Sequence, residues 1–235
     1  MTRLLFREDA YLRRCEATVV AVNERGIQLD ETIFYFTSGG QPGDRGTLQA
    51  PDARAITITD TVKGAGFDDV MHIAVAATSP LSVGDRVMAE LDWERRYRHM
   101  RLHTCMHLLC AVVAAPVTGG QIHDDRARLD FDMQGATLDK SNIEERLNAL
   151  ITAGYAVHSR WITGEELAAS PELVRTMSVK PPIGAGRVRL LEIPGVDLQA
   201  CGGTHVANTA EIGRVAIMEI LSKGKQNRRV IVGFA

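Results

Sequence analysis

The chain has 235 residues, of which 45 % are hydrophobic and 24 % are charged, so it can bury one large core or two modest ones. A formal net charge of −2 excludes a general attraction to nucleic acid, so any RNA contact must come from local basic patches. The sequence has no apolar run long enough to span a membrane, its first residues lack the apolar core of a signal peptide, and its four cysteines are scattered. We therefore expect a cytoplasmic protein in a reducing compartment, without a membrane partner.

Residues 1–92 have the pattern of a β-domain. Short runs rich in β-branched and aromatic residues follow one another closely, and no long helical pattern separates them. The expected strands cover residues 17–22, 26–29, 33–36, 55–62, 70–76 and 86–91. This arrangement predicts a small β-barrel.

A glycine-rich loop interrupts this β-region. The segment Ser38-Gly-Gly-Gln-Pro-Gly-Asp-Arg-Gly46 contains four glycines in nine residues. Glycine permits positive φ and a close approach of the backbone to another body. The loop is therefore either an irregular connection between strands or a backbone surface that lies against a metal site or a substrate. It is not a phosphate-binding P-loop, because no Gly-Lys-Ser/Thr follows.

A long helix is expected after the β-region. Asp92 is a suitable N-cap, and the helical pattern continues to about residue 115, where a proline stops it. In such a helix His103 and His107 lie on one face, because residues four apart stack along the axis. Its first turns carry arginines at positions 95, 96, 98 and 101 around Tyr97. These are either a solvated helix face or a site that holds phosphates and stacks a base.

The rest of the chain mixes helices and strands. Residues 117–125 have the composition of a polar loop, and a capping box of Ser141 and Glu144 predicts a helix that ends at Gly154. A cap at Thr163 predicts a short helix after an extended segment. Strands are expected over residues 126–132, 187–193, 214–220 and 229–234, the last two in the same sheet as 187–193. The basic loop 223–229 is either a plain surface turn or a contact for phosphates.

Two short motifs carry metal-binding chemistry. Cys201-Gly-Gly-Thr-His205 sets a thiolate and an imidazole four residues apart, and His103 and His107 have the same spacing. Cysteine and histidine are the preferred ligands of Zn²⁺, so the two pairs predict one zinc site made of His103, His107, Cys201 and His205. A zincin protease is excluded, because that motif requires a glutamate after the first histidine and Thr104 stands there.

The mode of zinc chemistry stays open at this stage. Catalytic zinc usually keeps one coordination position open beside three protein ligands, whereas this chain offers four. If all four bind tightly, the metal mainly positions a substrate. If one is loose, water or the substrate can enter the coordination sphere.

The two metal-binding pairs resemble those of the editing domain of alanyl-tRNA synthetase and of the free-standing AlaX proteins that share it. The similarity continues from Val206 to Gly213, and the glycine-rich loop resembles the motif of the β-barrel that precedes this domain in the synthetase. The resemblance implies an α+β fold, with a β-barrel over residues 1–92 and a two-layer zinc-binding editing domain over residues 93–235. It points to the longer, two-domain AlaX form rather than to the related editing domain of threonyl-tRNA synthetase.

The same resemblance implies a zinc-dependent hydrolase that cleaves Ser, with Gly as a second candidate, from mischarged alanine tRNA and uses no nucleotide cofactor. A synthetase pocket shaped for alanine cannot exclude glycine sterically and discriminates weakly against one added hydroxyl, so a second hydrolytic site is needed. Gln121 falls near a glutamine that lines the synthetase pocket. Thr204 and His123, the latter next to Asp124, are further candidates for catalysis. A solvated loop is the alternative explanation for His123 and Asp124, and a hydrogen bond to local backbone is the alternative for Thr204. Met106 departs from the small hydroxyl residue of many synthetase editing domains.

The expected contacts to substrate or tRNA fall in the three segments already described. They are Gly39, Gly40, Gln41 and Asp44 in the glycine-rich loop, Arg98 and Arg101 in the long helix, and Lys223, Lys225 and Arg228 in the basic loop. Two alternatives remain from the residues alone. One is a non-catalytic tRNA-binding module with structural zinc, and the other is a deacylase of another aminoacyl-tRNA.

Overall fold

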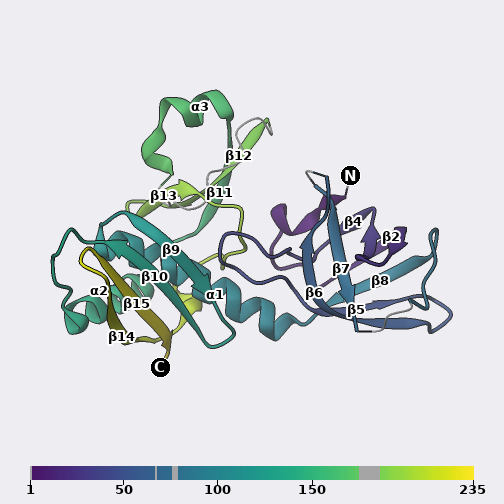
Figure 1. Cartoon of the computed structure of the whole chain (residues 1–235), viewed down its shortest axis with the longest axis horizontal. Coiled ribbons are helices and arrows are strands. Elements are labelled where there is room, and N and C mark those ends of the chain that lie inside the picture. Colours follow the sequence, from purple (N-terminus) through teal and green to yellow (C-terminus); the bar gives the residue numbers. More distant parts are fainter. Residues whose placement is uncertain (1, 67, 76–78, 175–185) are drawn as a thin grey trace. The chain divides into compact units, whose positions relative to one another are not determined.

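The computed structural model describes residues 2–66, 68–75, 79–174 and 186–235 (Figure 1). The chain divides into two compact units, Met1–Arg98 and His99–Ala235. The division falls inside the long helix α1 (Trp93–Val113) rather than at its first residue, where the sequence pattern changes. None of the helices in the described part of the chain is long and apolar enough to cross a membrane.

The first unit contains the predicted barrel. Its strands close in the order β2-β3-β7-β6-β5-β8, with antiparallel pairing throughout. Their bounds are β2 Arg14–Asn23, β3 Gly26–Leu29, β5 Gly46–Gln49, β6 Ala55–Lys63, β7 Val70–Ala74 and β8 Arg86–Leu91. The strands β1 (Arg3–Leu4) and β4 (Glu31–Thr32) form a short parallel pair, and a 3₁₀ turn, η1, covers Leu5–Arg7. Residue 76, the expected end of one strand, lies outside the described residues.

The predicted aromatic strand over residues 33–36 is wrong. These residues are buried, but they lie outside every named strand. Side chains bind their backbone in place of a neighbouring strand: the Phe34 amide donates to Thr32 Oγ1 at 3.0 Å, and the Tyr35 amide donates to the Asp44 carboxylate at 2.6 Å. The aromatic run therefore indicates a segment that is buried in the core, and not a strand of a β-sheet.

The glycine-rich loop is fastened to the start of α1 within the first unit. The fully buried Arg96 donates through Nε to both carboxylate oxygens of Asp44, at 3.0 and 2.9 Å, and through Nη2 to the carbonyl of Ile33 at 2.6 Å. The Arg95 guanidinium donates to the Gly43 carbonyl at 2.6 Å. A Cβ at Gly43 would lie 2.0 Å from the Thr61 carbonyl oxygen, so the loop needs glycine there. Two of the four arginines are thus internal and not part of a solvated face.

His72 is a further buried titratable side chain of the barrel unit. His72 is fully buried, with Nδ1 donating to the Ile27 carbonyl at 2.9 Å and Nε2 accepting from the Thr32 hydroxyl at 2.9 Å. This pair of bonds fits a neutral imidazole with its proton on Nδ1. Burial lowers the pKa of His72 from 6.5 to about 4.

The second unit contains a four-stranded antiparallel sheet with the order β14-β15-β10-β9. Its strands are β9 Val117–Ile122, β10 Arg126–Asp132, β14 Val215–Lys223 and β15 Asn227–Phe234. The expectation of a loop over residues 117–125 is wrong for its first six residues, which form β9. Two adjacent glycines weaken the sequence signal for a strand, but a Cβ at Gly120 would lie 3.0 Å from the side-chain ends of both Leu129 and Met106, so glycine gives the strand a close approach to α1.

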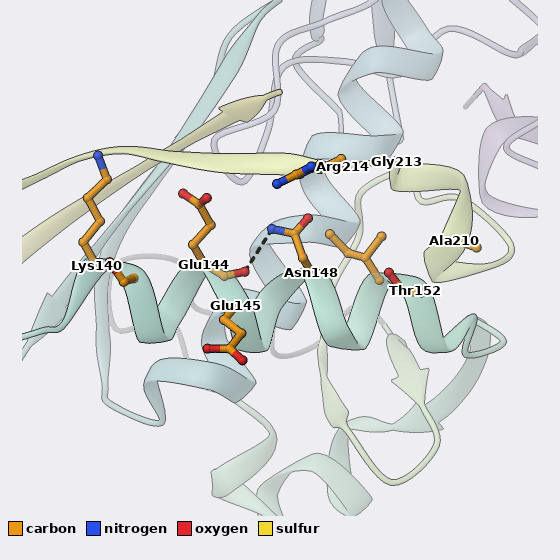
Figure 2. Close-up of a pocket in the computed structure, with 10 residues that line it drawn as sticks. Lys140, Glu144, Glu145, Asn148, Thr152, Ala210, Gly213 and Arg214 are labelled. Atoms are coloured by element: carbon orange, nitrogen blue, oxygen red, sulfur yellow. Dashed lines mark hydrogen bonds between the residues drawn. The ribbon is translucent and has the colours of Figure 1, made fainter.

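The helix α2 (Lys140–Ala153) lies along the edge of this sheet, and its apolar stripe and its end at Gly154 are as predicted. Its N-cap is Asp139 and not Ser141, since the Asp139 carboxylate accepts from the Asn142 amide at 3.1 Å. The Glu144 carboxylate instead accepts from the Ile217 amide at 2.8 Å. Asn148, one turn later, accepts from the Val215 amide at 3.1 Å and donates to the Val215 carbonyl at 2.9 Å. Polar side chains of α2 thereby take the place of a fifth strand beside β14 (Figure 2).

A separate three-stranded antiparallel sheet, with the order β11-β12-β13, completes the unit. Its strands are β11 His158–Thr163, β12 Arg187–Ile193 and β13 Asp197–Ala200. The helix α3 (Gly164–Ala169) follows β11 with the predicted capping box at Thr163, and two 3₁₀ turns cover Pro171–Leu173 and Thr209–Ile212. The last two predicted strands do share a sheet, but β12 belongs to this other one, which is a correction to the sequence-based expectation.

Candidate metal centre

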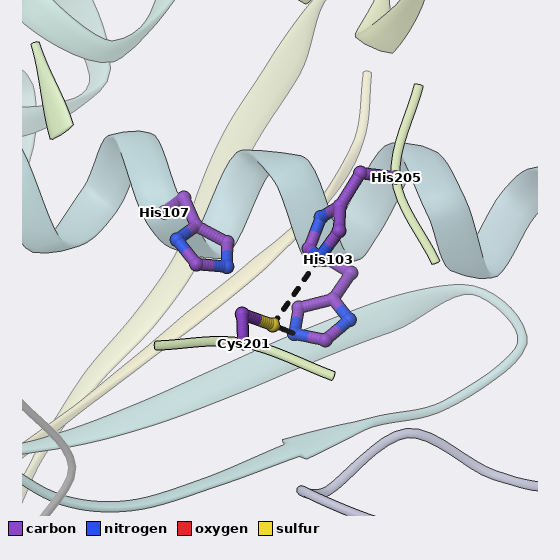
Figure 3. Close-up of side chains that lie close together, drawn as sticks. All are labelled: His103, His107, Cys201 and His205. Atoms are coloured by element: carbon purple, nitrogen blue, oxygen red, sulfur yellow. Dashed lines mark hydrogen bonds between the residues drawn. The ribbon is translucent and has the colours of Figure 1, made fainter. Parts of the chain in front are cut away.

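The structure brings the two predicted metal-binding pairs together. His103, His107, Cys201 and His205 each offer one ligand atom, and these atoms all lie within 4.8 Å of one another (Figure 3). The three histidines are buried and Cys201 is partly buried. Residues about a hundred positions apart in the chain therefore form one cluster inside the second unit.

The spacing of the donor atoms fits a tetrahedral metal site. Cys201 Sγ lies 3.6 Å from His103 Nε2 and 3.2 Å from His205 Nε2. With metal–sulfur and metal–nitrogen bonds of the usual lengths for zinc, a tetrahedron puts sulfur and nitrogen about 3.6 Å apart. One thiolate and three imidazoles are also a donor set that divalent transition metals accept. The cluster can hold a metal ion, and its chemistry is consistent with zinc.

Two elements position the ligands. The helix α1 presents His103 and His107 one turn apart, and the segment after β13 supplies Cys201 and His205. Arg189 of β12 fixes that segment, because its guanidinium donates to the carbonyls of Cys201 at 3.3 Å and of Gly203 at 2.9 Å. The Cys201 amide also donates to the Arg189 carbonyl at 3.0 Å, which continues the ladder between β12 and β13.

Side chains behind the ligands orient the imidazoles. His107 Nδ1 donates to the buried Asp197 carboxylate at 2.9 Å, and the same oxygen accepts from Gln199 at 2.7 Å. The Thr104 hydroxyl lies 3.4 Å from His205 Nδ1 and accepts from the Val206 amide at 3.2 Å. A carboxylate behind a ligating histidine is the usual arrangement in metal sites. Neither Asp197 nor Thr104 was expected from the sequence as a support of the metal site, although an aspartate four residues before Cys201 was an available signal.

The charges of the cluster shift the pKa values of its members. For His107, burial favours the neutral ring, but the hydrogen bond to Asp197 and the neighbouring Cys201 raise its pKa to about 9. Burial alone would raise the pKa of the Cys201 thiol, yet His103 and His205 hold it well below its usual value. Burial, together with the neighbouring His103, lowers the pKa of His205 well below 6.5. The cluster thus favours a thiolate, which is the form that binds metals.

The predicted catalytic residues occupy different surroundings. Thr204 is fully buried, next to the ligand His205. Gln121 is exposed on β9, and its carboxamide oxygen accepts from Arg128 at 2.9 Å. His123 is partly buried in the turn between β9 and β10, and its neighbour Asp124 contacts the buried His99 at 2.9 Å. The structure therefore places only Thr204 beside a member of the cluster.

The predicted substrate contacts also divide into exposed and internal residues. Gly39 is exposed and Gly40 partly so, both with positive φ, whereas Gln41 and Asp44 are buried. Arg98 is partly buried, and Arg101 donates to the Ile212 carbonyl at 2.9 Å and lies 4.1 Å from the Phe234 ring centroid. The basic loop spans the turn between β14 and β15 and the adjoining strand ends, with two exposed lysines and one partly buried arginine: Lys223, Lys225 and Arg228.

The fold and the cluster together define the class of protein: a β-barrel unit joined to an α+β unit with a buried three-histidine, one-cysteine centre. Residues 188–231 match the family described as "threonyl and alanyl tRNA synthetase second additional domain", and residues 10–95 match the class II (A) tRNA synthetases.

The chain belongs to the AlaX-M family of alanyl-tRNA editing proteins. It is 36 % identical to the alanyl-tRNA editing protein AlaX-M of Methanosarcina acetivorans, over 98 % of both chains. It is 33 % identical to the protein of the same name from Saccharolobus solfataricus, again over 98 % of both chains. An alanine–tRNA ligase of Saccharolobus islandicus is 32 % identical over 93 % of this chain, which corresponds to 25 % of the ligase.

Proposed function

We propose that this chain is a hydrolase that removes serine, and glycine as a second substrate, from mischarged alanine tRNA, with zinc bound at the candidate metal centre. The observation that carries the proposal is the cluster of four donor atoms within 4.8 Å, in a chain whose family is named for alanyl-tRNA editing. The need for such an activity follows from the weak discrimination that a small amino-acid pocket achieves by binding alone.

The residues present fit zinc, which His103, His107, Cys201 and His205 would hold. A bound zinc would supply Lewis-acid polarisation of the ester carbonyl or would hold the aminoacyl end in register. Asp197 keeps the His107 ring turned so that its other nitrogen faces the cluster, and Arg189 fixes the backbone on both sides of Gly202.

The remaining site residues are proposed contacts to the substrate. Thr204, Gln121 and His123 are proposed to contact the aminoacyl group. Contacts to the tRNA are proposed for the exposed tip of the glycine-rich loop and for the exposed lysines of the basic turn, because they are accessible to phosphates. The internal bonds of Asp44 and Arg101 favour a packing role for these two side chains.

The test is the deacylation of Ser-tRNA(Ala), Gly-tRNA(Ala) and Ala-tRNA(Ala) by the zinc-loaded full chain and by the Cys201→Ala variant. The expected result is rapid loss of the serine ester, slow loss of the alanine ester, and loss of activity in the variant. Cys15→Ala, which changes a free cysteine in the barrel unit, is the matched control and should retain activity. Intact Ser-tRNA(Ala) with enzyme in excess of substrate would overturn the proposal.

The same experiment separates the alternatives. A binding module with structural zinc would bind tRNA in a salt-dependent way without turnover, and removal of the metal would unfold its second unit. A deacylase of another aminoacyl-tRNA would spare the alanine tRNA and act on a threonine tRNA, which the match to the threonyl and alanyl synthetase domain makes the second substrate to assay.

A further inference from the structure

A tryptophan lies in the same row of the three-stranded sheet as the metal-binding cysteine. Trp161 on β11 pairs directly with Arg189 on β12, and the β12–β13 register continues from Leu190↔Ala200 to Arg189 and Cys201. Residues directly opposite each other in an antiparallel sheet point to the same face. Since neighbouring strands are about 4.8 Å apart, Trp161 starts about 10 Å from Cys201 on one face of the sheet.

This face differs from the opposite one, which forms a core. Ile162, Val188 and Leu190 on the opposite face are buried together with Leu167 of α3. The face with Trp161 instead carries Arg189, Gln199 and Asp197, which bind the metal-site loop or stand behind His107. The alternation of the strands therefore assigns Trp161 to the side of the sheet that serves the metal centre.

Trp161 is unusually accessible for a residue of its size. It is 40 % exposed on β11, which is an edge strand of this sheet, and its indole makes no hydrogen bond and no ring contact with the described residues. The other tryptophan of the chain, Trp93, stacks on Tyr97 at 5.5 Å. The indole of Trp161 thus presents a flat apolar face on which a planar group can stack.

An exposed cation lies beside the indole on the same face. Arg187 is two pairs further along the β11–β12 ladder, opposite Thr163, so it is the diagonal neighbour of Trp161 on the same face. It is exposed and forms no ion pair with any residue that the structure describes. An aromatic face with a neighbouring guanidinium is the combination that proteins use to stack a nucleobase and to hold the adjoining phosphate.

We propose that Trp161 stacks on the 3′-terminal nucleobase of the aminoacylated tRNA, with Arg187 binding the adjoining phosphate. The inference rests on the proposed function, because that nucleoside carries the ester that would lie at the metal centre. The base must then lie no further from Cys201 than the length of one nucleoside. The sheet provides a separation of this size between the cluster and the indole. The surface would select a terminal nucleotide by shape and charge, and the metal centre would select the amino acid.

The kinetic test compares an ester that carries the nucleobase with one that lacks it. Trp161→Ala should raise KM for Ser-tRNA(Ala) and for 3′-O-seryl adenosine by roughly 5- to 150-fold, the range of one base stack, at little change in kcat. Trp161→Phe should retain most of the affinity, and serine methyl ester should be hydrolysed equally by all three proteins. Met218→Ala, which removes an exposed apolar side chain from another sheet, is the control. Equal loss on both kinds of ester, or no loss on either, would overturn the inference.

A binding test is independent of hydrolysis. In a Trp93→Phe variant, Trp161 is the remaining indole, and addition of the trinucleotide CCA should quench its fluorescence in a saturable way. Arg187→Ala should weaken this binding and reduce its salt dependence. Quenching without deacylation of any ester would leave the stacking surface in place and reject the proposed function. Absence of quenching, or a dimer in sedimentation that Trp161→Ala converts to a monomer, would reject the stacking surface itself.

Discussion

The buried ion pair between the glycine-rich loop and α1 should dominate the stability of the barrel unit. In Asp44→Asn the loop keeps an acceptor for the Tyr35 amide, but the guanidinium of Arg96, which is fully buried, loses its counter-charge. Removing one partner of a buried pair typically costs about 3–5 kcal/mol, because the other charge is left without compensation. We therefore expect the free energy of unfolding of the first unit to fall by that amount.

The two tryptophans make this measurement specific to one unit. In a Trp161→Phe background, urea unfolding followed by fluorescence reports Trp93, which lies in the unit Met1–Arg98. Glu90→Gln removes one partner of the exposed pair with Arg14 and should change the unfolding free energy by less than about 1 kcal/mol.

A further variant tests whether the uncompensated charge of Arg96 causes the loss of stability. In an Arg96→Met background, Asp44→Asn should lower the free energy of unfolding much less than in the natural chain, because no buried charge is left without a counter-charge. A loss below about 1 kcal/mol for Asp44→Asn alone would refute the reasoning, since it would mean that water reaches Arg96 and compensates its charge.

Three further predictions concern other buried polar groups. The pKa of His72 is about 4 in the folded state and 6.5 in the unfolded state, so the unfolded chain binds more protons between these pH values. The free energy of unfolding should therefore fall by about 3 kcal/mol as the pH drops from 6.5 to 4. In denaturation measured at several pH values, His72→Gln should remove this dependence, whereas the exposed His158→Gln should keep it. Asp197→Asn should weaken zinc binding about 10- to 100-fold in a chelator competition, with unaltered far-UV circular dichroism; unchanged affinity would remove Asp197 from the support of the metal centre. Asn148→Ala leaves the buried Val215 backbone without its partners and should cost about 1–3 kcal/mol in chemical denaturation, whereas the exposed Asn142→Ala on the same helix should be nearly neutral.

Local signals indicated the barrel and the long helix, although they placed a strand at 33–36 and did not indicate β5, and the chemistry of the side chains grouped the four ligands. Alternating apolar residues mark strands such as β6, and the spacing of His103 and His107 needs only the helical repeat. Such signals failed at β9, where a strand contains adjacent glycines. Only one of them, Gly120, lies close to a side chain of α1, that of Met106, and this tertiary contact is not visible in the segment itself.

The distant partners of two carboxylates were also not expected from the sequence. Glu144 was expected to cap its own helix, but it serves the Ile217 amide 73 residues away. Asp197 was not singled out, because its role depends on His107, which is 90 residues distant. In both cases the partner lies far away in the chain, so only the tertiary fold reveals the pairing.

The glycine-rich loop shows how one motif can combine two physical roles. Gly43 and Gly46 are fixed by packing, since a Cβ at either position would lie 2.0 Å from a carbonyl oxygen of a neighbouring strand. Gly39 has a φ of +56° and no atom within 4 Å of such a Cβ, so it is constrained by its own backbone and not by its surroundings. The first pair therefore anchors the loop on the barrel beside Asp44, and the tip remains accessible. A contact with tRNA is therefore expected at the tip, where Gly39 is exposed, and not at Gly43, which is buried against the barrel.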